Sequence, residues 1–251
     1  MRVSYSELTA FCKKVLEGCG LPLGFVEEGA QMAAWGEFSG LSGLARLQAE
    51  ILSLEASDVS KIRVISEDSR FVCLDGGGQS SLLCGRLAAD IVYAKAREED
   101  TGVAQVVNCQ GSDLLIQNAV QMGKRGMACS IEWSEPHRRN KAVMLPARQQ
   151  PYLVRTSVKG LAEPGRADSF SIICYNLEKY PFHVELSEKG IKPENISIVR
   201  PETIQAEWEK AWQYGKEIDQ GIWRDLERVS NRVLIAATER SRLQGAGENA
   251  N

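Results

Sequence analysis

The residues best suited to chemistry lie in a few short stretches of the chain. Ser42 and Arg46 stand close together, between two segments with helical spacing. An arginine at such a turn predicts a carboxylate clamp, because its planar guanidinium can hold a carboxylate through two hydrogen bonds. The structural alternative is an ion pair with Glu50, which follows four residues later on the same expected helix. The sequence leaves both interpretations open.

A second candidate is His137, one of two histidines in the chain, which is followed by Arg138 and Arg139. Two neighbouring positive charges disfavour a protonated imidazole, so His137 would be a neutral base beside a pair that attracts anions. An exposed polar loop without function explains the same residues. Two histidines and no HExxH run or CxxC pair predict that the chain holds no metal ion.

A third stretch, Asp75 followed by Gly76, Gly77 and Gly78, has the glycines that a phosphate-binding loop uses. Its spacing matches neither GxGxxG nor GxxxxGK[ST]. The sequence therefore favours a tight turn between a strand and a helix at this point.

Helical patterns at both ends of the chain flank a middle part in which strands and helices alternate. Ser4 and Glu7 have the spacing of a capping box, and apolar residues then recur on one helical face up to Gly18. Further helices are expected over 23–38, 44–54, 83–94, 112–123 and from 201 and 218 onwards, and strands over 61–65, 70–74, 103–108, 127–133, 152–157 and 169–175. This order predicts an α/β fold with some parallel pairing. Residues 1–57 and 200–247 are expected to form a helical lobe and residues 58–199 an α/β core.

Composition excludes several classes of protein. The formal net charge of −3, without a long basic run, argues against nucleic acid and against an anionic membrane surface as partners. No apolar run approaches the ~20 residues that cross a bilayer. Seven scattered cysteines predict free thiols and a cytoplasmic location rather than a disulfide framework.

The stretch Gly40–Leu47 resembles the signature turn of the type-2 malate/L-lactate dehydrogenases, which are oxidoreductases that use NAD or NADP and have no Rossmann fold. Their turn usually reads Ser-His-Gly, with an arginine a few residues later. The resemblance implies that the histidine would be the proton donor and acceptor and that the arginine would meet the substrate carboxylate. In this chain Ser42 is followed directly by Gly43, so the histidine is missing while Arg46 remains.

Other segments carry the same resemblance over about residues 1–136. Asp75–Gln79 resembles the family's Asp-Gly-rich turn, and 126–136 resembles a strand that ends in Thr-Asn-x-x-Pro. Asn108, Cys109, Gln110 and Gly111 resemble an Asn-Ser-x-His-x-Gly loop, with Gln110 where a histidine is expected. The resemblance implies that Asn108, Gln110 and Gly111 would contact NAD or NADP, and that the core is a mixed sheet.

Downstream the resemblance fades. The family's Gly-Thr-Asn-Pro segment is absent and the chain is shorter than usual, which implies that part of the cofactor region is lost or rebuilt. The tail over 239–247 resembles the C-terminus of a related family of uncharacterised bacterial proteins, or is simply a helix that ends at a glycine.

These observations support three hypotheses. The first is a divergent, catalytically impaired relative that binds a small anionic ligand or a partner protein and forms a homodimer. The second is an active NAD(P)-dependent oxidoreductase of 2-keto or 2-hydroxy acids with a relocated general acid, which requires His137 and Arg46 to meet in one cleft. The third is a dimeric structural protein.

Overall fold

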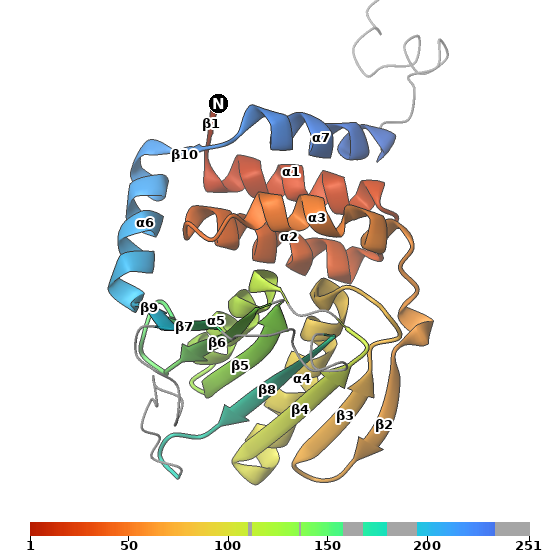
Figure 1. Ribbon diagram of the computed structural model, residues 1–251, viewed down its shortest axis with the longest axis vertical. Helices are drawn as coiled ribbons and strands as arrows, with labels where there is room; N and C mark the ends of the chain where they lie inside the picture. The colour runs from red at the N-terminus through yellow and green to blue at the C-terminus, as the bar shows by residue number, and fades with distance from the viewer. Residues whose placement is uncertain (110–111, 136, 158–167, 180–194, 234–251) are drawn as a thin grey trace, which may run out of the picture.

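Three N-terminal helices form one layer of the fold in the computed structural model (Figure 1). They are α1 (Tyr5–Gly18), α2 (Leu23–Phe38) and α3 (Gly43–Glu55). The capping box predicted for α1 is present, since the Ser4 amide donates to the Glu7 carboxylate and the Glu7 amide to the Ser4 hydroxyl. The structure describes residues 1–109, 112–135, 137–157, 168–179 and 195–233.

Helices α2 and α3 cross at very short range. A Cβ atom on Gly43 would lie 2.0 Å from the carbonyl oxygen of Ala33 and 2.6 Å from the amide nitrogen of Glu37. The Glu37 carboxylate also accepts a hydrogen bond from the Leu44 amide in the first turn of α3, at 3.0 Å. The glycine therefore permits the contact that sets the position of α3 over the sheet.

An eight-stranded mixed sheet forms the second layer, in the order β2-β3-β4-β8-β5-β6-β7-β9. The strands are β2 (Arg63–Glu67), β3 (Phe71–Asp75), β4 (Thr101–Val107), β5 (Ala128–Glu135), β6 (Arg138–Met144), β7 (Tyr152–Ser157), β8 (Ser169–Tyr175) and β9 (Ile196–Val199). Among the described strands of this sheet, only β3 and β4 pair in parallel. Strands β4 and β5 both run antiparallel to β8, so β3, β4 and β5 point the same way and their carboxyl ends meet at one edge.

Helices α4 (Ser81–Glu99) and α5 (Ile116–Lys124) cover one face of the sheet (Figure 1). The 3₁₀ turn η2 (Asp113–Leu115) leads into α5. The main apolar core lies between these helices and the sheet and includes Val92 and Ile131.

The C-terminal helices return to the first layer. Helix α6 (Pro201–Tyr214) follows β9 along one side of the molecule, and α7 (Gln220–Ser230) packs on α1 (Figure 1). A second apolar cluster joins residues of α1, α2 and α3 to residues near the other end of the chain. The remaining elements are the β1–β10 ribbon (Arg2–Val3 with Lys216–Glu217) and the 3₁₀ turns η1 (Val59–Lys61) and η4 (Asn231–Val233).

The predicted α/β fold class is confirmed, and so is its mixed sheet. The bounds of α2, β7 and β8 agree with the sequence-based prediction. Strands β6 and β9 were not predicted. The expected turn at 164–165 and the tail over 239–247 lie outside the described residues. Within the described ranges, none of the helices is both long and apolar enough to cross a membrane.

Candidate functional site

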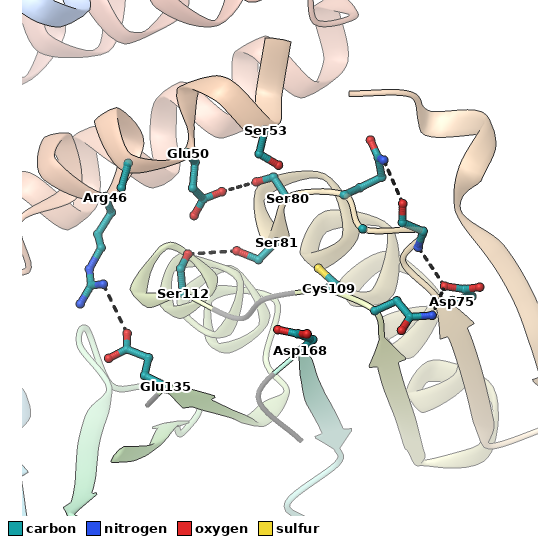
Figure 2. A pocket seen from close by; sticks show the side chains of 15 residues that line it. Arg46, Glu50, Ser53, Asp75, Ser80, Ser81, Cys109, Ser112, Glu135 and Asp168 are labelled. Carbon is teal, nitrogen blue, oxygen red and sulfur yellow. Dashed lines mark hydrogen bonds and ion pairs between the residues drawn. The ribbon is translucent and has the colours of Figure 1, made fainter. Parts of the chain in front are cut away.

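A cleft of about 930 Å³ opens between α3 and the edge where the carboxyl ends of β3, β4 and β5 meet (Figure 2). Open α/β sheets commonly bind ligands at this kind of edge. The described residues that line the cleft come from five segments of the chain: Arg46, Ala49, Glu50, Ser53, Asp75, Gly77, Gly78, Gln79, Ser80, Ser81, Asn108, Cys109, Ser112, Glu135 and Asp168.

The segments that carry the dehydrogenase resemblance meet at this cleft. Arg46 comes from the signature turn and its helix, Gly77 from the glycine-rich turn, Asn108 from the loop after β4, and Glu135 from the end of β5. These residues lie far apart in the sequence, and the fold brings them together. The cleft is therefore the best candidate for the functional site.

The glycine-rich turn does not offer free amides to a phosphate. The Gly76 amide donates to the Val107 carbonyl at 2.7 Å, and the Gly78 amide donates to the Asn108 carbonyl at 2.8 Å. The Gly77 amide donates to the Asp75 carboxylate at 2.9 Å. Gly77 and Gly78 have φ angles of 59° and 74°, which only glycine adopts easily. The segment is a strand-to-helix turn, as its spacing favours.

The carboxylate of Asp75 closes this turn. Its Oδ1 atom accepts hydrogen bonds from the Gly77 amide and from Asn108 Nδ2, both at 2.9 Å. The backbone bond from Gly77, followed by the bond from Asn108, lowers the pKa of Asp75. Asp75 is therefore ionised at neutral pH and adds a negative charge to the cleft wall.

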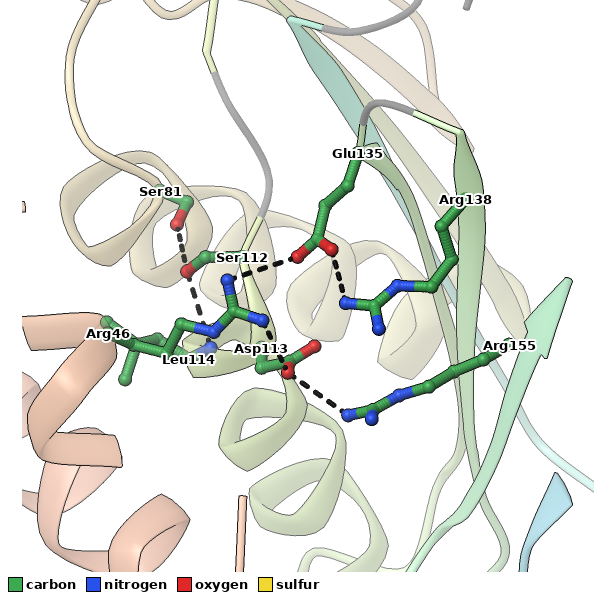
Figure 3. A network of polar contacts seen from close by, with 8 residues as sticks. All are labelled: Arg46, Ser81, Ser112, Asp113, Leu114, Glu135, Arg138 and Arg155. Carbon is green, nitrogen blue, oxygen red and sulfur yellow. Dashed lines mark hydrogen bonds and ion pairs between the residues drawn. The ribbon is translucent and has the colours of Figure 1, made fainter. Parts of the chain in front are cut away.

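Arg46 lies in a chain of five alternating charges (Figure 3). Its guanidinium contacts Asp113 at 3.2 Å and Glu135 at 3.3 Å. Asp113 also contacts Arg155 at 3.1 Å, and Glu135 pairs with Arg138. We call these five residues the charge chain. Arg46 therefore forms ion pairs, but with Asp113 and Glu135 rather than with the expected Glu50. The carboxylate clamp stays a prediction.

Glu50 lies on α3 one helical turn beyond Arg46, and its carboxylate accepts a hydrogen bond from the Ser80 hydroxyl (Figure 2). Burial raises the pKa of this carboxyl group, and the hydroxyls of Ser80 and Ser112 partly offset that effect. Ser81 and Ser112 share a hydrogen bond of 2.9 Å beside it. Sequence reasoning treated Glu50 only as an ion-pair partner, although its spacing from Arg46 puts both residues on one helix face.

Cys109 lines the cleft but is a poor nucleophile. A hydrogen bond with Cys84 and burial raise the pKa of the Cys109 thiol above its usual range. A thiol with a raised pKa carries little of the thiolate that reacts.

Two of the predicted site residues line the cleft and two others do not. Arg46 and Asn108 are in the lining. Ser42 is exposed, with a φ angle of 55° at the start of α3, and it is not part of the described lining. His137 is exposed at the turn between β5 and β6 and is also outside that lining. Gln110 and Gly111 lie outside the described residues.

Several solved structures with a similar architecture are malate, lactate or sulfolactate dehydrogenases. The malate dehydrogenase of Pyrococcus horikoshii OT3 superposes with a TM-score of 0.72 and 14% identity, over 94% of this chain and 96% of that one. The chain has the malate/L-lactate dehydrogenase fold. The sulfolactate dehydrogenase of Methanocaldococcus jannaschii has a TM-score of 0.68 and 14% identity, over 92% and 97% of the two chains.

We also compared the sequence with protein-family models and with curated proteins. Residues 3–79 match a family described as "Protein of unknown function (DUF3726)", which covers α1 to the glycine-rich turn. No curated protein matches the sequence. A third solved structure, the delta1-piperideine-2-carboxylate reductase of Pseudomonas syringae pvar. tomato, has a TM-score of 0.60 and 12% identity, over 93% and 100% of the chains. At these identities the likeness shows the fold alone.

Proposed function

We propose that this protein binds a small molecule in the cleft and has lost the hydride transfer of the dehydrogenases whose fold it shares. The observation that carries the proposal is the environment of Arg46. Its guanidinium already contacts two carboxylates, those of Asp113 and Glu135. Because their charges compensate its own, it attracts the carboxylate of a 2-keto acid only weakly.

The histidine expected as proton donor is the second missing part. Reduction of a keto group needs an acid within hydrogen-bond reach of the carbonyl oxygen. The described lining of the cleft contains no histidine, and both Ser42 and His137 are exposed outside it. Loss of a general acid alone typically reduces a rate by about 10²–10⁴-fold.

The described part of the cleft also fits a nicotinamide dinucleotide poorly. A pyrophosphate is normally held by free backbone amides or by basic side chains. The amides of Gly76, Gly77 and Gly78 already donate to protein acceptors, and Arg46 is the one basic residue of the described lining. These contacts support our proposal that the cleft does not hold NAD or NADP in the way a dinucleotide site does.

The first prediction concerns turnover. We expect the full-length chain, mixed with NADH or NADPH and with pyruvate or oxaloacetate, to oxidise the cofactor no faster than a blank without protein. A dehydrogenase of the same fold in the same assay is the positive control. Robust turnover that Arg46→Ala abolishes would contradict the proposal and would support the alternative, an active oxidoreductase with a relocated acid.

The homodimer predicted from the sequence is our proposal for the assembly, and edge strand β2 favours it. All five residues of β2 are exposed, and the side chains of Val64 and Ile65 are 56% and 58% exposed. An open edge with apolar side chains can pair with the same strand of a second copy. A ligand-free dimer of this kind would correspond to the third hypothesis, a structural protein.

The second prediction tests this assembly by light scattering after size-exclusion chromatography. We expect the wild-type chain at micromolar concentrations to have twice the monomer mass, and Ile65→Lys to shift it to the monomer. The matched control is Ile198→Lys, an exposed residue on β9 at the opposite edge of the sheet. A monomeric wild type, or a dimer that only the β9 variant disrupts, would contradict pairing through β2.

A further inference from the structure

The inner wall of the cleft places one carboxylate among buried hydroxyls. Glu50 projects from α3 toward Ser80, Ser81 and Ser112 (Figure 2). The three serines are at least nine-tenths buried, and each has its hydroxyl in a hydrogen bond of the wall. Buried polar groups are costly unless they are paired or serve a ligand. This wall is therefore a buried polar surface with defined hydrogen bonds, of the kind that can bind a polar ligand.

The hydrogen bonds of Ser80 and Ser112 link the cleft wall to the starts of two helical elements. Ser80 caps α4, because its oxygen accepts a hydrogen bond from the Leu82 amide at 3.1 Å, and its proton goes to Glu50. Ser112 caps η2 through the Leu114 amide at 3.3 Å. The N-terminus of a helix favours an anion. Here Ser80 at the start of α4 already donates its proton to Glu50, so a carboxyl group of the protein lies beside this helix start.

Most of the other charged side chains of the cleft are also negative. Besides Glu50, the described lining contains the carboxylates of Asp75, Glu135 and Asp168, against a single guanidinium, that of Arg46. Arg46 is already engaged by Asp113 and Glu135. A cleft lined by one sign of charge concentrates ligands of the opposite charge. The lining thus favours a cation over the small anion predicted from the sequence.

A metal ion fits this arrangement less well than an organic cation. Hard cations such as Ca²⁺ or Mg²⁺ need several oxygen ligands that converge on one point. Among the described residues, no group of three His, Cys, Asp or Glu side chains is arranged to hold a metal. A cleft of about 930 Å³ instead has room for a small organic molecule.

We propose that the cleft binds a small organic amine without a carboxylate, with its ammonium group against Glu50 and its remaining polar groups near Ser81 and Ser112. This inference rests on the proposed ligand-binding function and names the chemical class of the ligand. An amino acid is disfavoured because its carboxylate would meet the acidic wall without a free basic partner. Amines that carry hydroxyl or second amino groups suit the wall best.

Three four-carbon compounds test the charge preference directly. Putrescine has an ammonium group at each end, 4-aminobutyrate has one ammonium and one carboxylate, and succinate has two carboxylates. Isothermal titration calorimetry of the full-length chain at pH 8, which favours the ionised form of Glu50, should give the order putrescine, 4-aminobutyrate, succinate. We expect about tenfold or more between the first two, as for the loss of a charged contact.

The matched variants are Glu50→Gln in the cleft and Glu227→Gln, an exposed residue on α7. Glu50→Gln should weaken putrescine binding by about tenfold or more, whereas Glu227→Gln should leave it unchanged. Equal or tighter binding of succinate, unchanged binding in a folded Glu50→Gln, or no binding of putrescine would overturn the inference. The order of the three ligands with the wild-type chain shows which ligand charge the cleft prefers, even if Glu50→Gln does not fold. Cofactor turnover, measured separately, bears on the proposed function instead.

Discussion

We expect Asp113→Ala to lower the free energy of unfolding by about 3 kcal/mol, which is the low end of the cost of breaking a buried ion pair. The side chain of Asp113 is 4% exposed and contacts Arg46 at 3.2 Å and Arg155 at 3.1 Å. Its removal leaves two guanidinium groups without a shared counter-charge. Both arginines are partly exposed, so solvent screens part of the repulsion and keeps the cost at the low end.

Urea unfolding followed by linear extrapolation measures this effect. The matched control is Asp225→Ala, because Asp225 pairs with Arg228 at 3.0 Å and accepts a hydrogen bond from Gln48 at 2.8 Å, both on the exposed surface. An exposed pair contributes only about 0–1 kcal/mol. If Asp113→Ala were as stable as the control variant, the charge chain would not hold the helical layer to the sheet.

The milder Asp113→Asn variant extends this prediction to binding. It keeps the volume of the side chain but removes one of the two negative charges that engage Arg46. Succinate should therefore bind more tightly to Asp113→Asn than to the wild type. Unchanged succinate binding would mean that Glu135 alone is enough to occupy the guanidinium.

Local signals in the sequence were sufficient for much of the fold. The capping box of Ser4 and Glu7 determines the start of α1 through residues three apart, so no tertiary information is needed. The strand over 169–175 is similar, because partly exposed and buried residues alternate from Ser169 to Cys174. The strand over 152–157 has two successive buried residues, Leu153 and Val154, and its local signal is its β-branched and aromatic content.

Strand β6 shows where local signals fail. Its first residues, Arg138 and Arg139, are charged, and in the sequence they fit either an exposed polar loop or a pair that attracts anions. In the structure Arg138 is opposite Glu135 on β5, and Lys141 pairs with Glu132 at 2.8 Å. Cross-strand partners make these charges favourable in a strand. The sequence of β6 alone does not show that β5 will pair with it and supply the opposite charges.

The candidate site was predictable only in part, for the same reason. Arg46 and Asn108 were found because they belong to recognisable segments, and both line the cleft. The role of Asp113 was missed because it contacts Arg46 across 67 residues of sequence. Glu50 was assigned to Arg46 as an ion-pair partner because helical spacing does not reveal which side chain meets Ser80. Pairing over such separations depends on how α3 sits over the sheet.

Gly43 controls that position, and Gly43→Ala is expected to destabilise the protein by about 3 kcal/mol or more, beyond the usual range for overpacking. The added Cβ would lie 2.0 Å from the Ala33 carbonyl oxygen and 2.6 Å from the Glu37 amide nitrogen. Both contacts are with backbone atoms, which cannot move away as a flexible side chain can. The two helices would have to separate, and α3 would carry Arg46 and Glu50 with it.

The control for this variant is Gly24→Ala on α2. No heavy atom lies within 4 Å of a Cβ atom at Gly24, and the position is exposed near the start of the helix. Alanine there should be neutral or stabilising by up to ~1 kcal/mol. Gly43→Ala should thus lower the urea midpoint of unfolding, whereas Gly24→Ala should leave it unchanged or raise it. A Gly43→Ala protein as stable as the wild type would show that α2 and α3 can separate at little cost. The turn that carries Arg46 would then have no structural reason to keep its glycine.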